Sequence, residues 1–176
     1  MNKSDIRKKI LKVRKLNNFK DLNINFRSIL KILKINKPIS KIVAAYYPYN
    51  HEVDAIKILK KLEKKKFKIS LPRIKNNYQM DFFLWTTNDP LQINKYGIPE
   101  PTSEKVVYPS ILLVPLVAYD NKFNRVGYGG GFYDRYINRF KKHKKIITIG
   151  LAYSFQKVKK IPINKYDIKL DFVVTE

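Results

Sequence analysis

The chain has 176 residues, 44% of them hydrophobic, which predicts a single domain over residues 1–176 with a sizeable buried core. It contains no cysteine and only two histidines, so disulfides and thiol chemistry are excluded and a histidine-based zinc site is not expected. No apolar run reaches the ~18 residues of a membrane span, and the basic N-terminus lacks the apolar core of a signal peptide. A cytoplasmic protein without a membrane partner is therefore expected.

The formal net charge is +23, from 37 lysines and arginines against 14 acidic residues. Such a charge fits a solvated surface, the steering of anionic substrates or a nucleic-acid footprint. Most of the basic residues are lysines scattered along the chain, whereas bidentate contacts to phosphates or bases favour arginine. A solvated surface is the leading interpretation, and nucleic acid is not expected as a partner.

The first half of the chain alternates between helical and strand patterns of apolar residues. In chain order the expected elements are a helix over 4–16, a helix over 23–34, a strand over 41–47, a helix over 51–65 with Asn50 as its N-cap, and strands over 67–71 and 79–85. The first strand is apolar throughout, which is typical of a central strand in a sheet covered on both faces.

The second half continues the pattern after a long polar stretch over 86–109, a length more typical of a functional loop than of a simple connection. The expected elements that follow are a strand over 111–119, a helix from about 132 to 142, and strands over 145–152 and 171–175. This order predicts an α/β protein, a three-layer α/β/α sandwich with a mostly parallel, Rossmann-like central sheet.

The most distinctive segment is the glycine-rich block over 124–135, because positions 127–131 hold four of the six glycines. It joins an expected strand to an expected helix, where backbone N–H groups and the helix dipole favour an anion. The block ends in Gly-Phe-Tyr and so is not a Walker A loop, and Phe132 stands where a dinucleotide fingerprint needs glycine. Phosphate or nucleotide binding is the leading interpretation, with a tight structural turn as the alternative.

Four further positions attract attention on chemical grounds. Lys3 and Arg7 are four residues apart on the first expected helix and can contact one anion together, although ordinary solvated charge is the leading interpretation of the pair taken alone. Glu52 is placed in the first turn of a helix beside the carboxyl end of a strand, where a carboxylate also simply favours the dipole. Asp134, one turn after the glycines, can hold a metal that bridges phosphate oxygens.

Taken in order, these segments resemble the 5-formyltetrahydrofolate cyclo-ligase family. The resemblance covers nearly the whole chain, and the glycine block is its specific part. The segments that carry it are Lys3-x-x-x-Arg7, Tyr47 to Glu52-Val53, Leu71-Pro72-Arg73, Met80-Asp81-Phe82, Gly97-Ile98-Pro99-Glu100-Pro101, Asp120, Arg125 to Arg135 and Asp167-x-x-x-Asp171.

The resemblance implies an ATP- and Mg²⁺-dependent ligase of one-carbon metabolism that closes 5-formyltetrahydrofolate to 5,10-methenyltetrahydrofolate and releases ADP and phosphate. A phosphorylated formyl group is the implied intermediate. The expected partners are ATP and the folate, with or without a polyglutamate tail, and the expected state is a monomer. Such a phosphoryl transfer needs positioning and charge neutralisation rather than cysteine or histidine.

The resemblance also implies roles for single residues. The implied ATP contacts are Lys3, Arg7, Arg125, Gly127, Gly129, Gly130, Gly131 and Tyr133, with Arg125 and Tyr133 as catalytic residues. The implied folate contacts are Tyr47, Glu52, Tyr128, Gly129, Gly130, Gly131 and Phe132, to which we add Arg73 and Tyr96. The implied Mg²⁺ ligands are Asp134 and Asp171.

Two departures from the family pattern affect these roles. Some members carry arginine and lysine where this chain has Tyr128 and Gly130, so Lys3, Arg7 and Arg125 must supply more of the charge here. Ala55 stands where threonine is expected. Two other classes compete: a non-catalytic nucleic-acid-binding protein, which would cluster its arginines, and a sugar-phosphate isomerase, which would need a general base and no ATP.

Overall fold

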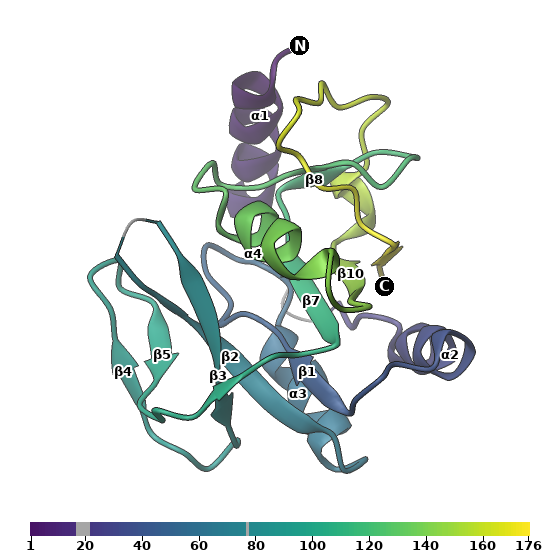
Figure 1. The fold of residues 1–176 in the computed structure, drawn as a ribbon. Helices are drawn as coiled ribbons and strands as arrows, with labels where there is room; N and C mark the ends of the chain where they lie inside the picture. Colours follow the sequence, from purple (N-terminus) through teal and green to yellow (C-terminus); the bar gives the residue numbers. More distant parts are fainter. Residues whose placement is uncertain (17–21, 77) are drawn as a thin grey trace.

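A computed structural model describes residues 1–16, 22–76 and 78–176. Its centre is a seven-stranded sheet ordered β11-β10-β7-β1-β2-β3-β6 (Figure 1). The strands of this sheet are β1 (Ile42–Ala44), β2 (Lys68–Ile74), β3 (Met80–Trp85), β6 (Val106–Val107), β7 (Ile111–Pro115), β10 (Ile147–Leu151) and β11 (Phe172–Val174). The five strands from β11 to β2 run parallel, and β3 and β6 add an antiparallel edge.

Helices cover both faces of this sheet because its buried strands are apolar on both sides. Val43 packs with the helices α2 (Phe26–Asn36) and α3 (Ala55–Glu63), whereas the next residue, Ala44, packs with α4 (Phe132–Lys141) on the opposite face. The predicted three-layer α/β/α sandwich with a mostly parallel sheet is therefore confirmed.

The N-terminal helix α1 (Lys3–Leu16) lies outside this sandwich, against the short hairpin of β8 (Ala118–Tyr119) and β9 (Arg125–Val126) (Figure 1). Its apolar stripe packs into a small separate core. The buried members of that core are Ile6, Ile10, Val117, Ala118, Val126 and Ile161. The helix thereby stands beside the glycine-rich block, which begins at β9.

The helix expected over 51–65 is shorter than predicted. Asn50 and His51 both have positive φ angles, 53° and 59°, and form a turn rather than a helix start. The helix begins at Ala55, and Asp54 is its N-cap, accepting a hydrogen bond from the backbone N–H of Lys57 at 3.1 Å. The predicted cap at Asn50 is therefore wrong, and Glu52 lies in the connection before α3 rather than in its first turn.

Three expected strands also end elsewhere. β2 continues through Pro72 to Ile74. The pairing of β1 with β2 ends at Ser70, and from there on β2 pairs only with β3. The missing N–H of Pro72 therefore leaves no acceptor on β1 unpaired. The strand expected over 111–119 breaks after β7, because side chains of Arg14 and Gln156 occupy the carbonyl of Leu116. The first strand, expected over 41–47, is shorter than predicted and covers only Ile42–Ala44.

The polar stretch over 86–109 is more ordered than a loop. It contains the hairpin of β4 (Leu91–Ile93) and β5 (Pro99–Pro101) and then the edge strand β6. Gly97, with a φ of 75°, lies in the turn between β4 and β5. The hairpin stands beside β2 and β3 at the side of the molecule (Figure 1). The remaining short element is a 3-10 helix over Ser154–Gln156.

Candidate active site

A cavity of about 1060 Å³ opens where the parallel strands finish. Tyr46 and Tyr47 follow β1, Pro115 ends β7, and the glycine-rich block and the start of α4 cover the opening. The start of α1, the β4–β5 hairpin and the segment 164–168 supply the remaining walls. In open α/β sheets this edge is the usual place for a ligand.

The structure brings most of the predicted site residues to this one cavity. Those that line it are Lys3, Arg7, Tyr47, Glu52, Tyr96, Arg125, Gly127, Tyr128, Gly129, Gly130, Gly131, Phe132, Tyr133 and Asp134. Arg73 and Asp171 do not line it. The particular role of each residue stays a prediction.

Arg73 is used within the fold. Its guanidinium donates to the carbonyl oxygens of Pro101 and Ser103 at 2.6 and 2.7 Å and pairs with Glu104 at 2.9 Å. It also lies 4.1 Å from the ring centre of Phe83. These contacts tie β2 to the segment after β5, so the side chain points away from the cavity that it was expected to line.

The glycine-rich block has a geometry that needs glycine at two positions. Gly129 and Gly131 have φ angles of 107° and 65°, which residues with a Cβ rarely adopt. Gly131 precedes α4, and no side chain of the described residues caps that helix. The first N–H groups of α4 are therefore free of a side-chain acceptor, and the helix dipole favours an anion there.

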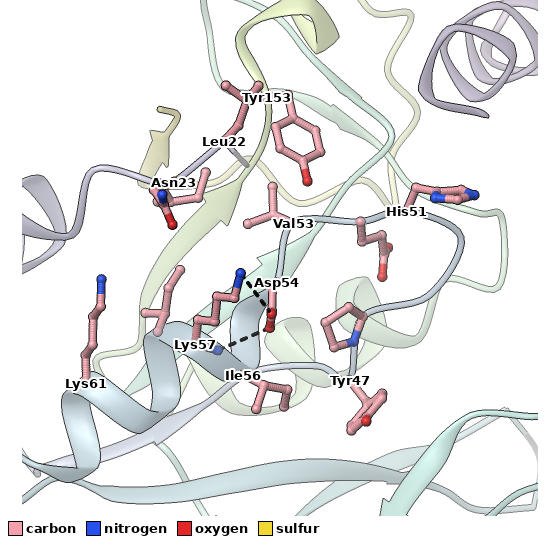
Figure 2. A pocket seen from close by; sticks show the side chains of 14 residues that line it. Leu22, Asn23, Tyr47, His51, Val53, Asp54, Ile56, Lys57, Lys61 and Tyr153 are labelled. Carbon is pink, nitrogen blue, oxygen red and sulfur yellow. Dashed lines mark hydrogen bonds and ion pairs between the residues drawn. The ribbon is translucent and has the colours of Figure 1, made fainter. Parts of the chain in front are cut away.

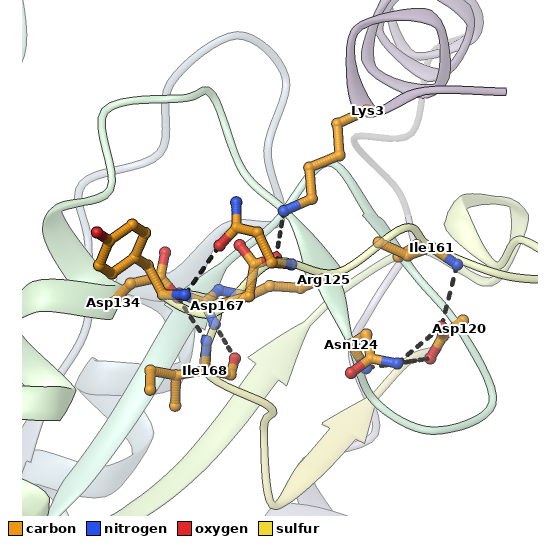
Figure 3. Close-up of polar contacts among 10 residues, drawn as sticks. Lys3, Asp120, Asn124, Arg125, Asp134, Ile161, Asp167 and Ile168 are labelled. Carbon is orange, nitrogen blue, oxygen red and sulfur yellow. Dashed lines mark hydrogen bonds and ion pairs between the residues drawn. The ribbon is translucent and has the colours of Figure 1, made fainter.

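Cations and carboxylates meet on one side of the cavity (Figure 3). Lys3 forms an ion pair with Asp167, and Arg125 donates to Asp134 at 2.8 Å. The backbone of Ile168 joins the two pairs, because its N–H donates to Asp134 at 3.0 Å and its carbonyl accepts from Arg125. Each of these cations thus has a carboxylate partner before any ligand is considered.

Arg7 supports the same side from α1. Its Nε donates to the carbonyl of Gly127 at 2.8 Å, and its guanidinium lies against Gly129. A helix face therefore holds the start of the glycine block in place. We refer to this side of the cavity as the ionic end, formed by Lys3, Arg7, Arg125, Asp134 and Asp167.

The other side of the cavity is aromatic and holds one buried carboxylate. Tyr49 and Tyr128 meet edge to face with their ring centres 6.1 Å apart. The backbone N–H of Tyr49 donates to Glu52 at 3.0 Å, and only 9% of Glu52 is exposed. We refer to this side as the aromatic end, formed by Tyr47, Tyr49, Glu52 and Tyr128.

Burial raises the pKa of Glu52 to about 7, although the hydrogen bond from Tyr49 and the charge of Arg14 act in the opposite direction. The carboxyl group is thus poised to change charge near neutral pH. A group of this kind in a cavity is a candidate for ligand recognition or proton transfer.

Tyr133 lines the cavity with an unusual hydroxyl group. The oxygen is buried and has no hydrogen-bond partner among the described residues. Burial and the nearby charge of Glu52 raise the pKa of this phenol, so it stays protonated at physiological pH. The hydroxyl is therefore a donor without an acceptor, which a bound ligand can supply.

Several residues that line the cavity were not predicted as site residues from the sequence. Tyr49 and Glu100 are examples, and Glu100 is buried while it accepts from the backbone of Ile74 and from Asn94. Both occur inside segments that carried the family resemblance. An acidic residue between two prolines, just after Gly97, is the sequence signal that could have identified Glu100. Nothing local in the sequence marks Tyr49.

The two predicted metal ligands are not brought together. Asp134 lies at the ionic end, whereas Asp171 precedes β11 at the opposite edge of the sheet and accepts from the N–H and hydroxyl of Thr148 at 2.8 and 2.7 Å. The described residues contain no group of three or more side chains placed to bind a metal. The prediction that Asp134 and Asp171 bind Mg²⁺ together is therefore corrected, because only Asp134 lines the cavity.

A smaller cavity of about 520 Å³ lies on the other side of the 47–54 turn (Figure 2). Tyr47 and Glu52 contribute to both cavities, so this turn is the wall between them. Lys57 and Asp54, which line this smaller cavity, form an ion pair with each other. No helix in the described part of the chain has the length and apolar character needed to cross a membrane.

A three-layer sandwich with a deep cavity at the carboxyl ends of its parallel strands is the architecture of small-molecule enzymes of the α/β class. A model of the 5-formyltetrahydrofolate cyclo-ligase family matches residues 1–176. The chain belongs to this enzyme family, and the family resemblance predicted from the sequence is confirmed.

Individual relatives agree with the family match. The 5-formyltetrahydrofolate cyclo-ligase of Haemophilus influenzae is 33% identical over 138 residues, which cover 74% of this chain and 73% of the relative. That of Mycoplasma genitalium is 28% identical and covers 99% of this chain and 98% of its own length. The solved structure of Aquifex aeolicus 5,10-methenyltetrahydrofolate synthetase has a TM-score of 0.74 at 30% identity, covering 99% of this chain and 90% of the other.

Proposed function

We propose that the protein cyclises 5-formyltetrahydrofolate to 5,10-methenyltetrahydrofolate and that ATP, as its Mg²⁺ complex, drives the closure. The formyl oxygen attacks the γ-phosphorus and ADP leaves. The N–H nitrogen of the second folate position then adds to the activated formyl carbon and gives up its proton, and phosphate departs with the former formyl oxygen and that proton. An amide oxygen is a poor leaving group, and phosphorylation makes its departure possible.

The observation that carries this proposal is the division of one cavity into an ionic end and an aromatic end. A glycine-rich block and three cations suit the phosphates of ATP, and tyrosine rings beside a buried carboxylate suit a flat heterocycle with N–H donors. The names of the relatives supply the substrate, and the two unlike ends supply a place for each partner.

The residues of the ionic end receive the following roles. Arg125 neutralises charge on the transferring phosphate, Lys3 and Arg7 contact the remaining phosphates, and the first N–H groups of α4 bind an oxygen. Tyr133 donates its unpaired hydroxyl hydrogen to the phosphate or the formyl oxygen. These are electrostatic roles, which dominate in phosphoryl transfer.

Asp134 is the residue that we assign to Mg²⁺. Its Oδ1 accepts from Arg125 and Ile168, whereas no hydrogen bond from the described residues reaches its Oδ2. Mg²⁺ is usually held by one or two carboxylates together with phosphate oxygens and water, so one free carboxylate oxygen fits. Bound there, the ion would neutralise phosphate charge.

Glu52 is assigned to the heterocycle. Its Oε2 accepts from Tyr49, which leaves Oε1 to accept from a substrate N–H. Tyr47, Tyr128 and Phe132, which line the same cavity, supply apolar and ring contacts to the heterocycle.

The domain limits, the cytoplasmic location and the monomeric state remain predictions.

A single assay tests the proposal. Purified protein is incubated with 5-formyltetrahydrofolate, and the methenyl absorbance is followed with ATP and Mg²⁺ together, with each alone and with neither. Product should form only with both, and one ADP should appear for each methenyl group. Turnover without ATP would refute the ATP-driven closure, and absence of turnover in all four mixtures would refute the assignment.

A further inference from the structure

Arg14 is a fully buried cation in the part of α1 that faces the cavity wall. Only 1% of it is exposed, and it does not line the cavity. No carboxylate among the described residues lies within ion-pair distance of it. Burying an unpaired charge is costly, so arginine at such a position calls for an explanation.

The hydrogen bonds of Arg14 connect α1 to the aromatic end. One terminal nitrogen donates to the hydroxyl of Tyr128 at 3.0 Å, and the other donates to the carbonyl of Leu116 at 2.8 Å. Its Nε has no partner among the described residues. The contact to Leu116 does not explain the arginine, because Gln156 also donates to that carbonyl at 3.0 Å.

The contact to Tyr128 links Arg14 to two further residues of the aromatic end. The ring of Tyr128 meets that of Tyr49, and the backbone N–H of Tyr49 holds Glu52. The positive charge of Arg14 also opposes the rise in the pKa of Glu52 that burial causes. One buried guanidinium is thereby linked to all three groups, through contact or through charge.

We propose that Arg14 is a positioning residue for the folate subsite: it holds Tyr128 against Tyr49 and so fixes the aromatic wall beside Glu52, without touching either substrate. This inference rests on the proposed function and adds to it. Lys3 and Arg7, on the same helix, serve the ionic end, so α1 supports both ends of the cavity through different residues.

The test compares Arg14→Met with the wild type in the methenyl assay. The KM for 5-formyltetrahydrofolate should rise about 10-fold, whereas the KM for ATP should change less than about 2-fold. Arg27→Met makes the same change on an exposed arginine of α2 and should alter neither constant. A purely structural role of Arg14 would instead lower the Tm and leave both KM values unchanged.

A double-mutant cycle separates positioning from direct contact. Tyr128→Phe should raise the KM for folate in the wild-type background and add nothing in the Arg14→Met background, because the hydroxyl has then already lost its partner. Additive effects of the two substitutions would overturn the proposal.

Arg14→Lys serves where the methionine variant does not fold. An ammonium lacks the two separate donor nitrogens with which the guanidinium bonds Tyr128 and Leu116, so the KM for folate should rise while that for ATP stays constant. An unchanged KM for folate would overturn the proposal. Folate binding followed by tyrosine fluorescence without ATP gives a second readout. If the wild type itself neither binds nor converts the folate, the proposed function fails, and the role of Arg14 fails with it. If the wild type binds and Arg14→Met binds equally well, only the role of Arg14 fails.

Discussion

The two ends of the cavity are built on different physical principles. At the ionic end, Lys3 and Arg125 are already engaged by Asp167 and Asp134, so an anionic ligand must replace or share these contacts. At the aromatic end, Glu52 is held by a backbone N–H and shielded from water, with no ion pair among the described residues. The ionic end is therefore adjustable, whereas the aromatic end is preformed and sensitive to pH.

The largest effect is expected at the ionic end. Arg125→Ala should lower kcat by roughly 100-fold, the scale seen when a preorganised charge contact to a transition state is lost. Arg125→Lys should recover only part of the rate, because it cannot bond Asp134 and Ile168 together. Steady-state kinetics with both substrates varied would measure this, and an effect confined to the KM for folate would erase the distinction between the two ends.

The matching change at the aromatic end is Glu52→Gln. It should weaken folate binding by ~1.5–3 kcal/mol, the scale of a charged hydrogen bond, and leave the KM for ATP unchanged. Titration of the protein with folate in the absence of ATP measures the change in the free energy of folate binding directly. A change in the Mg²⁺ requirement of this variant would show that Glu52 belongs with the metal instead.

Glu52 should also make stability depend on pH. Its pKa is about 7 in the folded protein against an ordinary value of 4.5, so the folded state holds the proton more tightly. Stability from this group is present below pH 4.5 and is lost as the pH rises through 7. Glu52→Gln should therefore stabilise the protein at pH 8, by up to about 3 kcal/mol, and not at pH 4.

Denaturant unfolding of both proteins at the two pH values measures the difference. A gain of equal size at both values would mean that the charge of Glu52 is not the cause.

A smaller effect separates the ionic end from the opposite edge of the sheet. Asp171→Ala should lower stability by about 1–2 kcal/mol, because the buried N–H and hydroxyl of Thr148 lose their acceptor. The Mg²⁺ concentration for half-maximal rate should stay constant, whereas Asp134→Asn should raise it. If Asp171→Ala also raises it, the site extends beyond the cavity described above.

The smallest effect has the opposite sign. Asp167→Asn should lower the KM for ATP by about 2- to 5-fold, because it frees Lys3 from a partly exposed ion pair worth at most about 1 kcal/mol. Combining it with Lys3→Met should abolish the gain. An increase in the KM of the single variant would mean that Asp167 helps ATP binding rather than competing with it.

Local sequence patterns predicted the sheet and the glycine-rich block because each of these is encoded by neighbouring residues. Apolar runs marked the buried strands, and the glycines marked a strand-to-helix connection. Element ends were predicted less well where long-range partners decide them. The strand that begins at Ile111 ends early because Arg14, about 100 residues earlier in the chain, donates a hydrogen bond to the carbonyl of Leu116, which a longer strand would use for pairing.

The residues of the site divide in the same way. Those within the glycine-rich block were found because the block is compact in sequence, whereas Tyr49 owes its place to a turn with two positive φ angles that no local pattern announces. Asp171 was predicted from the family resemblance and Arg73 was added to the implied folate contacts, and the structure uses both to hold strands together.

The contacts of α1 bear on the order in which the protein can assemble as it is synthesised. Lys3, Arg7 and Arg14 bond to partners 164, 120 and 114 residues further along the chain. The apolar stripe of the helix likewise waits for the β8–β9 hairpin. A lysine-rich helix of 14 residues is marginal alone in water. Helix α1 is made before the rest of the described fold and yet docks among the last, so the cavity acquires both of its ends only when most of this chain has been made.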